Sequence, residues 1–83
     1  MYLEVVTPDK KAFEGEVKAV KVPGSNGSFE VLNNHAPVIS TLTEGQIRIT
    51  TKSDVQYLNI DSGILEMLDN KIVILAEAII DAE

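Results

Sequence analysis

The apolar residues of this sequence come in short runs that recur about every 8–12 residues, with turn-forming residues between them. Thr43-Glu44-Gly45 and Asp61-Ser62-Gly63 are two of these turn segments. The longest uninterrupted apolar run covers residues 72–76, far fewer than the ~20 that a membrane-spanning helix needs. Short runs at this spacing are typical of a β-sandwich or β-barrel, so the pattern predicts an all-β chain.

The short connections indicate how the strands pair. Sequential strands joined by turns of a few residues must pair largely antiparallel. We therefore predict one domain, residues 1–83, folded as an antiparallel two-layer β-sandwich. We also expect a bulge or bend near Ala19. Only residues 77–83 are a candidate for a helix, and seven residues make a poor helix alone. The expected strands cover residues 2–7, a short run around Phe13, 17–22, 28–32, 38–42, 46–51, 55–60, 64–68 and 72–76.

The charge balance excludes one class of function. Seven Lys and Arg residues against thirteen Asp and Glu residues give a net charge of −6, whereas a nucleic-acid-binding surface needs clustered positive charge. The acidic excess lies in residues 53–83, where Lys71 is the only basic residue. We interpret this segment as a solvated face; the functional alternative is that it repels wrong partners.

The chain has no cysteine, which excludes disulfides and thiolate metal sites and indicates a reducing, cytosolic compartment. The N-terminus lacks a basic stretch followed by an apolar one, so no signal peptide is expected.

No catalytic constellation is visible. His35 is the only histidine, and its neighbours Asn34 and Ala36 offer no carboxylate to orient it; no serine lies in a G-x-S-x-G turn. Calcium-loop and phosphate-loop motifs are also missing. Glu14 and Glu16 share one face of a strand and are interpreted as solvated surface. We expect no enzymatic activity, cofactor, metal or small-molecule substrate.

Lys71 suggests an alternative function. It lies at a predicted hairpin tip, where the small acidic β-sandwiches that carry lipoyl or biotinyl groups have their modified lysine. The context Asp69-Asn70-Lys71-Ile72 lacks the usual flanking residues of those carrier domains. A carrier domain modified at Lys71 therefore stays the alternative to an interaction subunit.

The most informative segment is residues 22–37, which read VPGSNGSFEVLNNHAP. Further motifs are LEVVTP at 3–8, FEGEV at 13–17, EGQIRI at 44–49 and SGILE at 62–66. Together, and in register over nearly the whole chain, these motifs resemble the epsilon-subunit family of F-type ATP synthases.

The resemblance implies a β-sandwich of about ten strands that performs no chemistry itself. It implies binding to the foot of the rotor's gamma subunit and contact with the membrane-embedded c-ring, so that torque from ion flow reaches the catalytic head and drives ATP synthesis. It also implies a peripheral position at the cytoplasmic face of the bacterial inner membrane.

The resemblance also assigns partner contacts. Expected gamma contacts are Thr7, His35 and Ser40, and expected c-ring contacts are Ser28, Asn33, Asn34 and His35. For His35, a hydrogen bond that fixes its loop is the alternative to a direct partner contact. Structural roles at turns are expected for Gly24, Gly27, Pro37, Gly45 and Gly63.

Two departures from the family pattern stand out. Glu30 replaces a glycine of many relatives, and Asn33-Asn34 replace Pro-Gly, which gives the tip of this segment new donors and acceptors. Many relatives also continue into a C-terminal helical hairpin that restrains ATP hydrolysis, whereas this sequence ends at Glu83. A short native form without the inhibitory arm and a truncated chain are both open.

Overall fold

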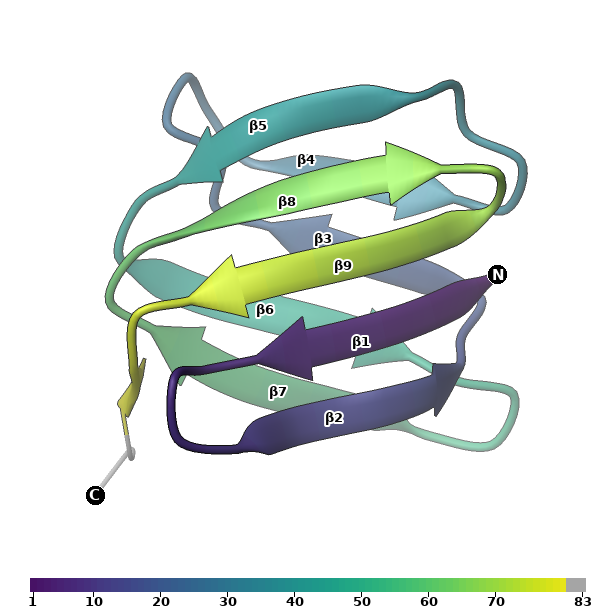
Figure 1. Cartoon of the computed structure of the whole chain (residues 1–83). Coiled ribbons are helices and arrows are strands. Elements are labelled where there is room, and N and C mark those ends of the chain that lie inside the picture. The colour runs from purple at the N-terminus through teal and green to yellow at the C-terminus, as the bar shows by residue number, and fades with distance from the viewer. Residues whose placement is uncertain (81–83) are drawn as a thin grey trace.

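The computed structural model describes residues 1–80, which form ten β-strands and no helix (Figure 1). The strands are β1 Tyr2–Val6, β2 Lys11–Glu16, β3 Ala19–Val22, β4 Phe29–Leu32, β5 Val38–Leu42, β6 Gly45–Thr50, β7 Val55–Ile60, β8 Gly63–Leu68, β9 Lys71–Ala76 and β10 Ile79–Ile80. They form two five-stranded sheets. Sheet A has the order β2-β1-β9-β8-β5, and sheet B has the order β10-β7-β6-β3-β4.

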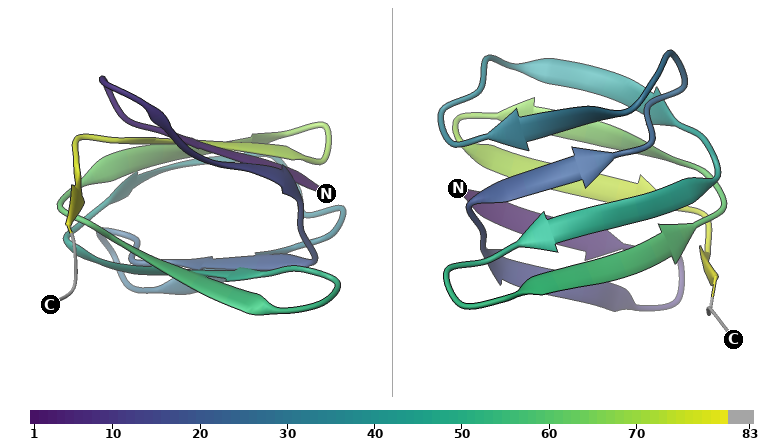
Figure 2. Two further views of the ribbon diagram at one scale, coloured as in Figure 1. Left: turned by 90° about the horizontal axis from the view of Figure 1, so that it is seen from below. Right: turned by 180° about the vertical axis from the view of Figure 1, so that it is seen from behind.

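The two sheets stack face to face (Figure 2), which confirms the predicted all-β sandwich. Four sequential pairs, β1–β2, β3–β4, β6–β7 and β8–β9, are antiparallel as expected. Other short connections, such as those from β5 to β6 and from β7 to β8, instead carry the chain from one sheet to the other. One pair differs, because β1 and β9 run parallel with Tyr2 opposite Lys71. These two strands come from opposite ends of the described chain, so no short turn fixes their relative direction.

The segment that is a candidate for a helix instead has a bend at Glu77, followed by the strand β10. β10 pairs antiparallel with β7, with Ile79 opposite Ile60. The backbone N–H of Ala78 also donates to the Asp61 carboxylate at 3.0 Å. Pairing with the free edge of β7 satisfies backbone groups that an isolated helical turn would leave to water. Residues 81–83 of the candidate helix lie outside the described residues.

The predicted bend near Ala19 is confirmed, and it marks the crossing between the sheets. The chain bends at Lys18, so β3 begins later than the expected 17–22 strand. The N–H of Val17 donates to the Met1 carbonyl beside sheet A at 2.8 Å, and the N–H of Lys18 donates to the Thr50 carbonyl of sheet B at 2.7 Å. These bonds satisfy the backbone where the chain changes layers.

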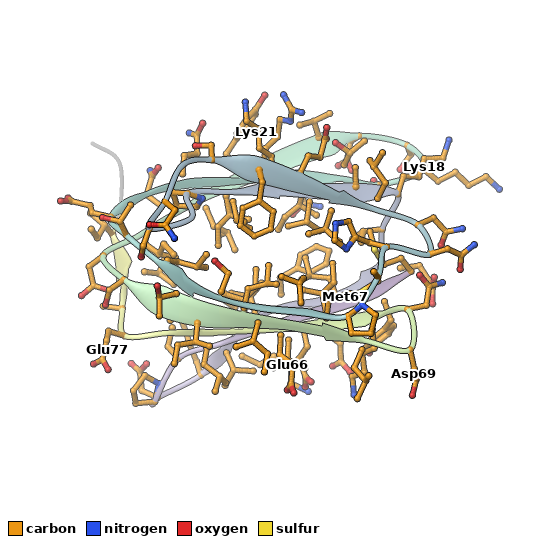
Figure 3. The ribbon with its side chains drawn as sticks, turned by 90° about the horizontal axis from the view of Figure 1, so that it is seen from above. Lys18, Lys21, Glu66, Met67, Asp69 and Glu77 are labelled. Atoms are coloured by element: carbon orange, nitrogen blue, oxygen red, sulfur yellow. The ribbon has the colours of Figure 1, made fainter. Side chains whose placement is uncertain are left out.

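The core lies between the sheets because alternate side chains of each strand point inward. In β6, Ile47 and Ile49 are fully buried, as predicted. Figure 3 shows the same alternation in β8, where Met67 points between the layers and Glu66 points away. The buried cluster consists of Leu3, Val5, Val17, Val20, Val22, Val31, Leu42, Ile47, Ile49, Ile60, Leu65, Met67, Ile72, Ile74 and Ala76.

Two of the glycines matched to turns are in fact the first residues of strands. A Cβ on Gly63 would lie 2.7 Å from the Leu75 carbonyl oxygen, and one on Gly45 would lie 2.8 Å from the Pro23 side chain. Close approach of the neighbouring strand β9 therefore explains Gly63, and close approach of the Pro23 side chain explains Gly45. Gly27 differs, since its φ of 124° requires glycine in the β3–β4 turn.

Candidate partner-binding surfaces

The outer surface of sheet A exposes large apolar side chains. Ile39 is 72% exposed, Ile64 47%, Leu68 53% and Leu75 54%. They extend over the neighbouring strands β5, β8 and β9. We call these four residues the apolar face. Contiguous exposed apolar surface on a small domain indicates a binding site for another protein.

The strand register shows how the apolar face is organised. One cross-strand row runs Ile64, Leu75, Val6, from β8 through β9 to β1. The next row runs Ile39, Glu66, Val73, from β5 through β8 to β9. Side chains opposite one another on neighbouring strands lie in contact distance, so the rows make one surface in which apolar side chains surround Glu66. Glu4, opposite Val73 on β1, lies at the border of this surface.

The outer surface of sheet B has a different character. Its central row reads Glu30, Lys21, Arg48, Tyr57 across β4, β3, β6 and β7. The Arg48 guanidinium forms an ion pair with the Glu30 carboxylate at 3.0 Å. Lys21 projects away from the interior on this side, as Figure 3 shows. Leu32, Val55 and Tyr57 are also exposed here, but β3 and β6, which carry Lys21 and Arg48, lie between Leu32 and the other two. The apolar face of sheet A is therefore the stronger candidate.

Thr7 lies at one border of the apolar face. It is 5% exposed, and its hydroxyl lies 2.8 Å from the Asp9 carboxylate and 3.1 Å from the Lys10 carbonyl. The bond from Thr7 is the main reason that the pKa of Asp9 is lowered. Thr7 thus stabilises the β1–β2 turn. It also lines a surface cavity of about 510 Å³ that contains Ile64 and Leu75 of the apolar face.

Ser40 lies in β5, the edge strand of sheet A. It is half-buried and pairs with the buried Leu65, so its side chain is on the inner side of the strand. Its hydroxyl donates to the Thr41 carbonyl at 3.0 Å. Ser40 and Thr7 are therefore not neighbours. They lie on opposite sides of the apolar face, with β8 and β9 between their strands.

Asn33, Asn34 and His35 form the loop between β4 and β5. The loop is tied to the β8–β9 turn, because the Asn34 N–H donates to the Asn70 side-chain oxygen at 2.8 Å and the Asn70 amide donates to the Asn33 side chain at 2.9 Å. His35 is exposed, and its Nδ1 lies 2.6 Å from the Ala36 carbonyl. With Nδ1 protonated, this contact is a hydrogen bond of the kind that the loop-fixing alternative for His35 requires, and it leaves the rest of the ring accessible for a partner.

We expect Asn70→Gly to loosen this loop while preserving the turn, since glycine readily adopts the Asn70 φ of 61°. Loss of two exposed hydrogen bonds should cost about 1 kcal/mol and accelerate hydrogen exchange at the Asn34 amide. Asp69→Gly is the matched control, because Asp69 has φ 52° in the same turn and does not take part in the bonds to this loop. Equal exchange rates at Asn34 in the two variants would contradict this account.

Ser28 lies at the other end of β4. It precedes Phe29, the first residue of β4, whereas Asn33 follows Leu32, the last. Five residues of extended chain separate Ser28 from Asn33, which corresponds to roughly 17 Å. The structure thus places the expected c-ring residues at both ends of one edge strand of sheet B rather than in one cluster (Figure 1).

A charged network covers the other edge of sheet A. Lys11 forms ion pairs with Glu4 and Glu14, both at 2.9 Å. Hydrogen bonds from Tyr2 and then from Lys11 lower the pKa of Glu14, and the same bond to Glu14 raises the pKa of Tyr2. The Lys71 amine lies 5.9 Å from the centre of the Tyr2 ring. This edge is acidic and solvated, unlike the apolar face beside it.

Within residues 1–80, no group of three or more His, Cys, Asp or Glu side chains is placed to hold a metal ion. In the same range, no helix is long and apolar enough to cross a membrane. The features in the described part of the chain that could recognise a partner are thus the apolar face and the β4 edge.

Sequence reasoning missed the apolar face, although a signal was present. Strands β8 and β9 read GILEML and KIVILA, with apolar residues on both faces of the pleat. A strand of this kind is covered on both sides. Within residues 1–80 the outer side of β8 and β9 is uncovered, as the exposure of Ile64, Leu68 and Leu75 shows.

Comparison with known proteins identifies relatives over nearly the whole length. A family model described as ATP synthase, Delta/Epsilon chain, beta-sandwich domain matches residues 1–82. The ATP synthase epsilon chains of Pelotomaculum thermopropionicum and Koribacter versatilis are each 40% identical, over 98% and 90% of this chain. That of Salinibacter ruber is 35% identical over 93%. This chain spans 60%, 53% and 58% of those relatives, little more than half their length.

Two solved structures share the fold. One is a chain in the central stalk and c-ring structure of the Tetrahymena thermophila mitochondrial ATP synthase, with a TM-score of 0.81, 19% identity, and coverage of 96% of this chain and 65% of that one. The other is a chain in the OSCP, F1 and c-ring structure of the Euglena gracilis mitochondrial ATP synthase, with a TM-score of 0.87, 18% identity, and coverage of 94% and 51%. At these identities the likeness establishes a common β-sandwich.

Proposed function

This chain belongs to the family of ATP synthase delta/epsilon β-sandwich domains, and we propose that residues 1–83 form the N-terminal domain of a non-catalytic rotor subunit. The subunit links gamma to the c-ring and couples ion flow to ATP synthesis. These partners hold it peripherally at the cytoplasmic face of the bacterial inner membrane. The family match gives no support to the alternative of a carrier domain modified at Lys71.

The gamma subunit docks on the apolar face, and the exposure of that face is the observation that carries the proposal. Ile39 and Leu75 are more than half exposed, and burying them against a partner would be favourable. Thr7 and Ser40, the expected gamma contacts, lie at opposite borders of the same surface. The Thr7 side chain is buried and that of Ser40 is on the inner side of the edge strand β5, so the same partner meets Ser40 only if it also covers the β5 edge.

The c-ring contacts the β4 edge of sheet B. Ser28 and the Asn33–Asn34 pair lie at opposite ends of this strand, so one planar partner can reach both ends only if the strand lies along it. His35 follows Asn34 at the corner where β4 leads into β5, which gives it access to the ring and to gamma. The exposed amides and the Ser28 hydroxyl supply donors and acceptors for polar loops of the ring.

Photo-crosslinkers at three positions in the assembled synthase test this arrangement. Position 75, on the apolar face, should capture gamma, and position 28 should capture the c-subunit. A crosslinker at Tyr57, which is 56% exposed on sheet B, is the control and should capture neither. Crosslinking of gamma from position 57 but not from position 75 would show that the proposed docking face is wrong.

A further inference from the structure

Glu66 is the charged residue at the centre of the apolar face. Its register neighbours across the strands are Ile39 on β5 and Val73 on β9. Along its own strand, the outward side chains on either side of it are Ile64 and Leu68. The carboxylate therefore has an apolar side chain on each of its four sides. Figure 3 shows that Glu66 points outward from sheet A, away from the interior.

Glu66 takes part in none of the ion pairs or side-chain hydrogen bonds formed among residues 1–80. The basic residue closest in register is Lys71, which is opposite Leu68 and so diagonal to Glu66. The Lys71 amine lies over the Tyr2 ring at 5.9 Å, toward β1 and away from β8. Water solvates the Glu66 carboxylate as long as the apolar face is uncovered.

Docking changes that situation. A partner that covers Ile39, Ile64 and Leu68 also removes Glu66 from water, and an unpaired carboxylate in such an interface is strongly unfavourable. The surface next to Glu66 is hollowed on both sides, by a cavity of about 340 Å³ toward Ile39 and one of about 350 Å³ toward Val73. Either hollow can admit a long side chain from the partner.

We propose that the gamma-type partner presents a basic side chain, surrounded by apolar residues, that pairs with Glu66 at the centre of the interface. This inference rests on the proposed function and specifies the chemistry of its docking site. An arginine fits best, because its guanidinium is weakly hydrated and can bond a carboxylate with two parallel hydrogen bonds. Glu66 thus selects the partner by charge, while its four apolar neighbours contribute the buried area.

The direction in which one substitution, Glu66→Gln, changes the affinity for the partner tests the proposal. The probe is the source organism's complex of catalytic head and gamma subunit, prepared without this chain, and the affinity is measured by titration calorimetry. Glu66→Gln keeps the shape but removes the charge, so its affinity should fall at least about tenfold. If gamma offered no cation, the same variant would bind as well as or better than the original chain, because the cost of burying a charge would vanish. That result would overturn the proposal.

Two further variants distinguish the possible reasons for a negative result. Glu66→Gln in a Lys71→Gln background should show the same tenfold loss, since the cation comes from the partner; disappearance of the loss would identify Lys71 as the cation and overturn the inference. Glu44→Gln, at an exposed carboxylate outside sheet A, is the control and should bind normally. No binding by the unaltered chain would overturn the proposed function together with this inference, whereas normal binding with an unaffected Glu66→Gln variant would overturn the inference alone.

Discussion

Replacing Leu65 with alanine is expected to lower the free energy of unfolding by about 2–5 kcal/mol. Leu65 is fully buried in β8 and belongs to the cluster between the sheets. Its register partner on β9, Ile74, is also fully buried, so the site cannot collapse easily and most of the cavity will remain. A domain of this size has a total stability of about 4–12 kcal/mol, and the variant loses a large share of it.

Leu68 provides a matched control for this experiment. It lies three residues further along the same strand and is 53% exposed. Leu68→Ala removes the same atoms, and its effect on the free energy of unfolding should stay below about 1 kcal/mol. Urea denaturation followed by circular dichroism measures both variants. Similar losses of stability at positions 65 and 68 would mean that the inner and outer faces of β8 are assigned wrongly.

The strands of this fold are predictable from the sequence because the alternation of inward and outward residues involves only residues close in sequence. Alternation in residues 46–51 places Ile47 and Ile49 inward, and both are fully buried. The parallel pairing of β1 with β9 is not local, since no turn connects the two strands. β10 contains only Ile79 and Ile80, which is too short for any periodicity to be visible. Its existence depends on the free edge of β7, which appears only when the sheet has formed.

In the candidate surfaces, too, the features that depend on neighbouring residues are predictable, and those that depend on distant residues are not. Asn33, Asn34 and His35 are recognisable as an exposed polar loop, because asparagines tolerate the left-handed φ of 66° seen at Asn34. Their tether to Asn70 joins residues 36 and 37 positions apart, and no pattern in the sequence indicates it. The apolar face likewise depends on which strands lie side by side. Ile39 and Leu75 become parts of one surface only because β5, β8 and β9 are neighbours in sheet A.

Inserting a charge into the apolar face should strongly weaken partner binding without unfolding the domain. Ile64 is 47% exposed and has Leu75 as its cross-strand neighbour. Ile64→Asp leaves a carboxylate beside Leu75 that must lose its water when gamma docks, and the one cation that we assign to the partner is already paired with Glu66. The affinity for the complex of catalytic head and gamma subunit should fall about 30-fold or more, equivalent to about 2 kcal/mol.

Val55→Asp is the control, because Val55 is a β-branched residue with 46% exposure on sheet B. Both substitutions put aspartate into a strand, so their costs in β-propensity should be similar and small beside the binding effect. Thermal unfolding verifies that the two variants are equally folded. Binding that is lost for Ile64→Asp and kept for Val55→Asp assigns the docking face to sheet A. The opposite result would move the gamma contact to sheet B, where Arg48 and Lys21 would then have to meet an acidic partner.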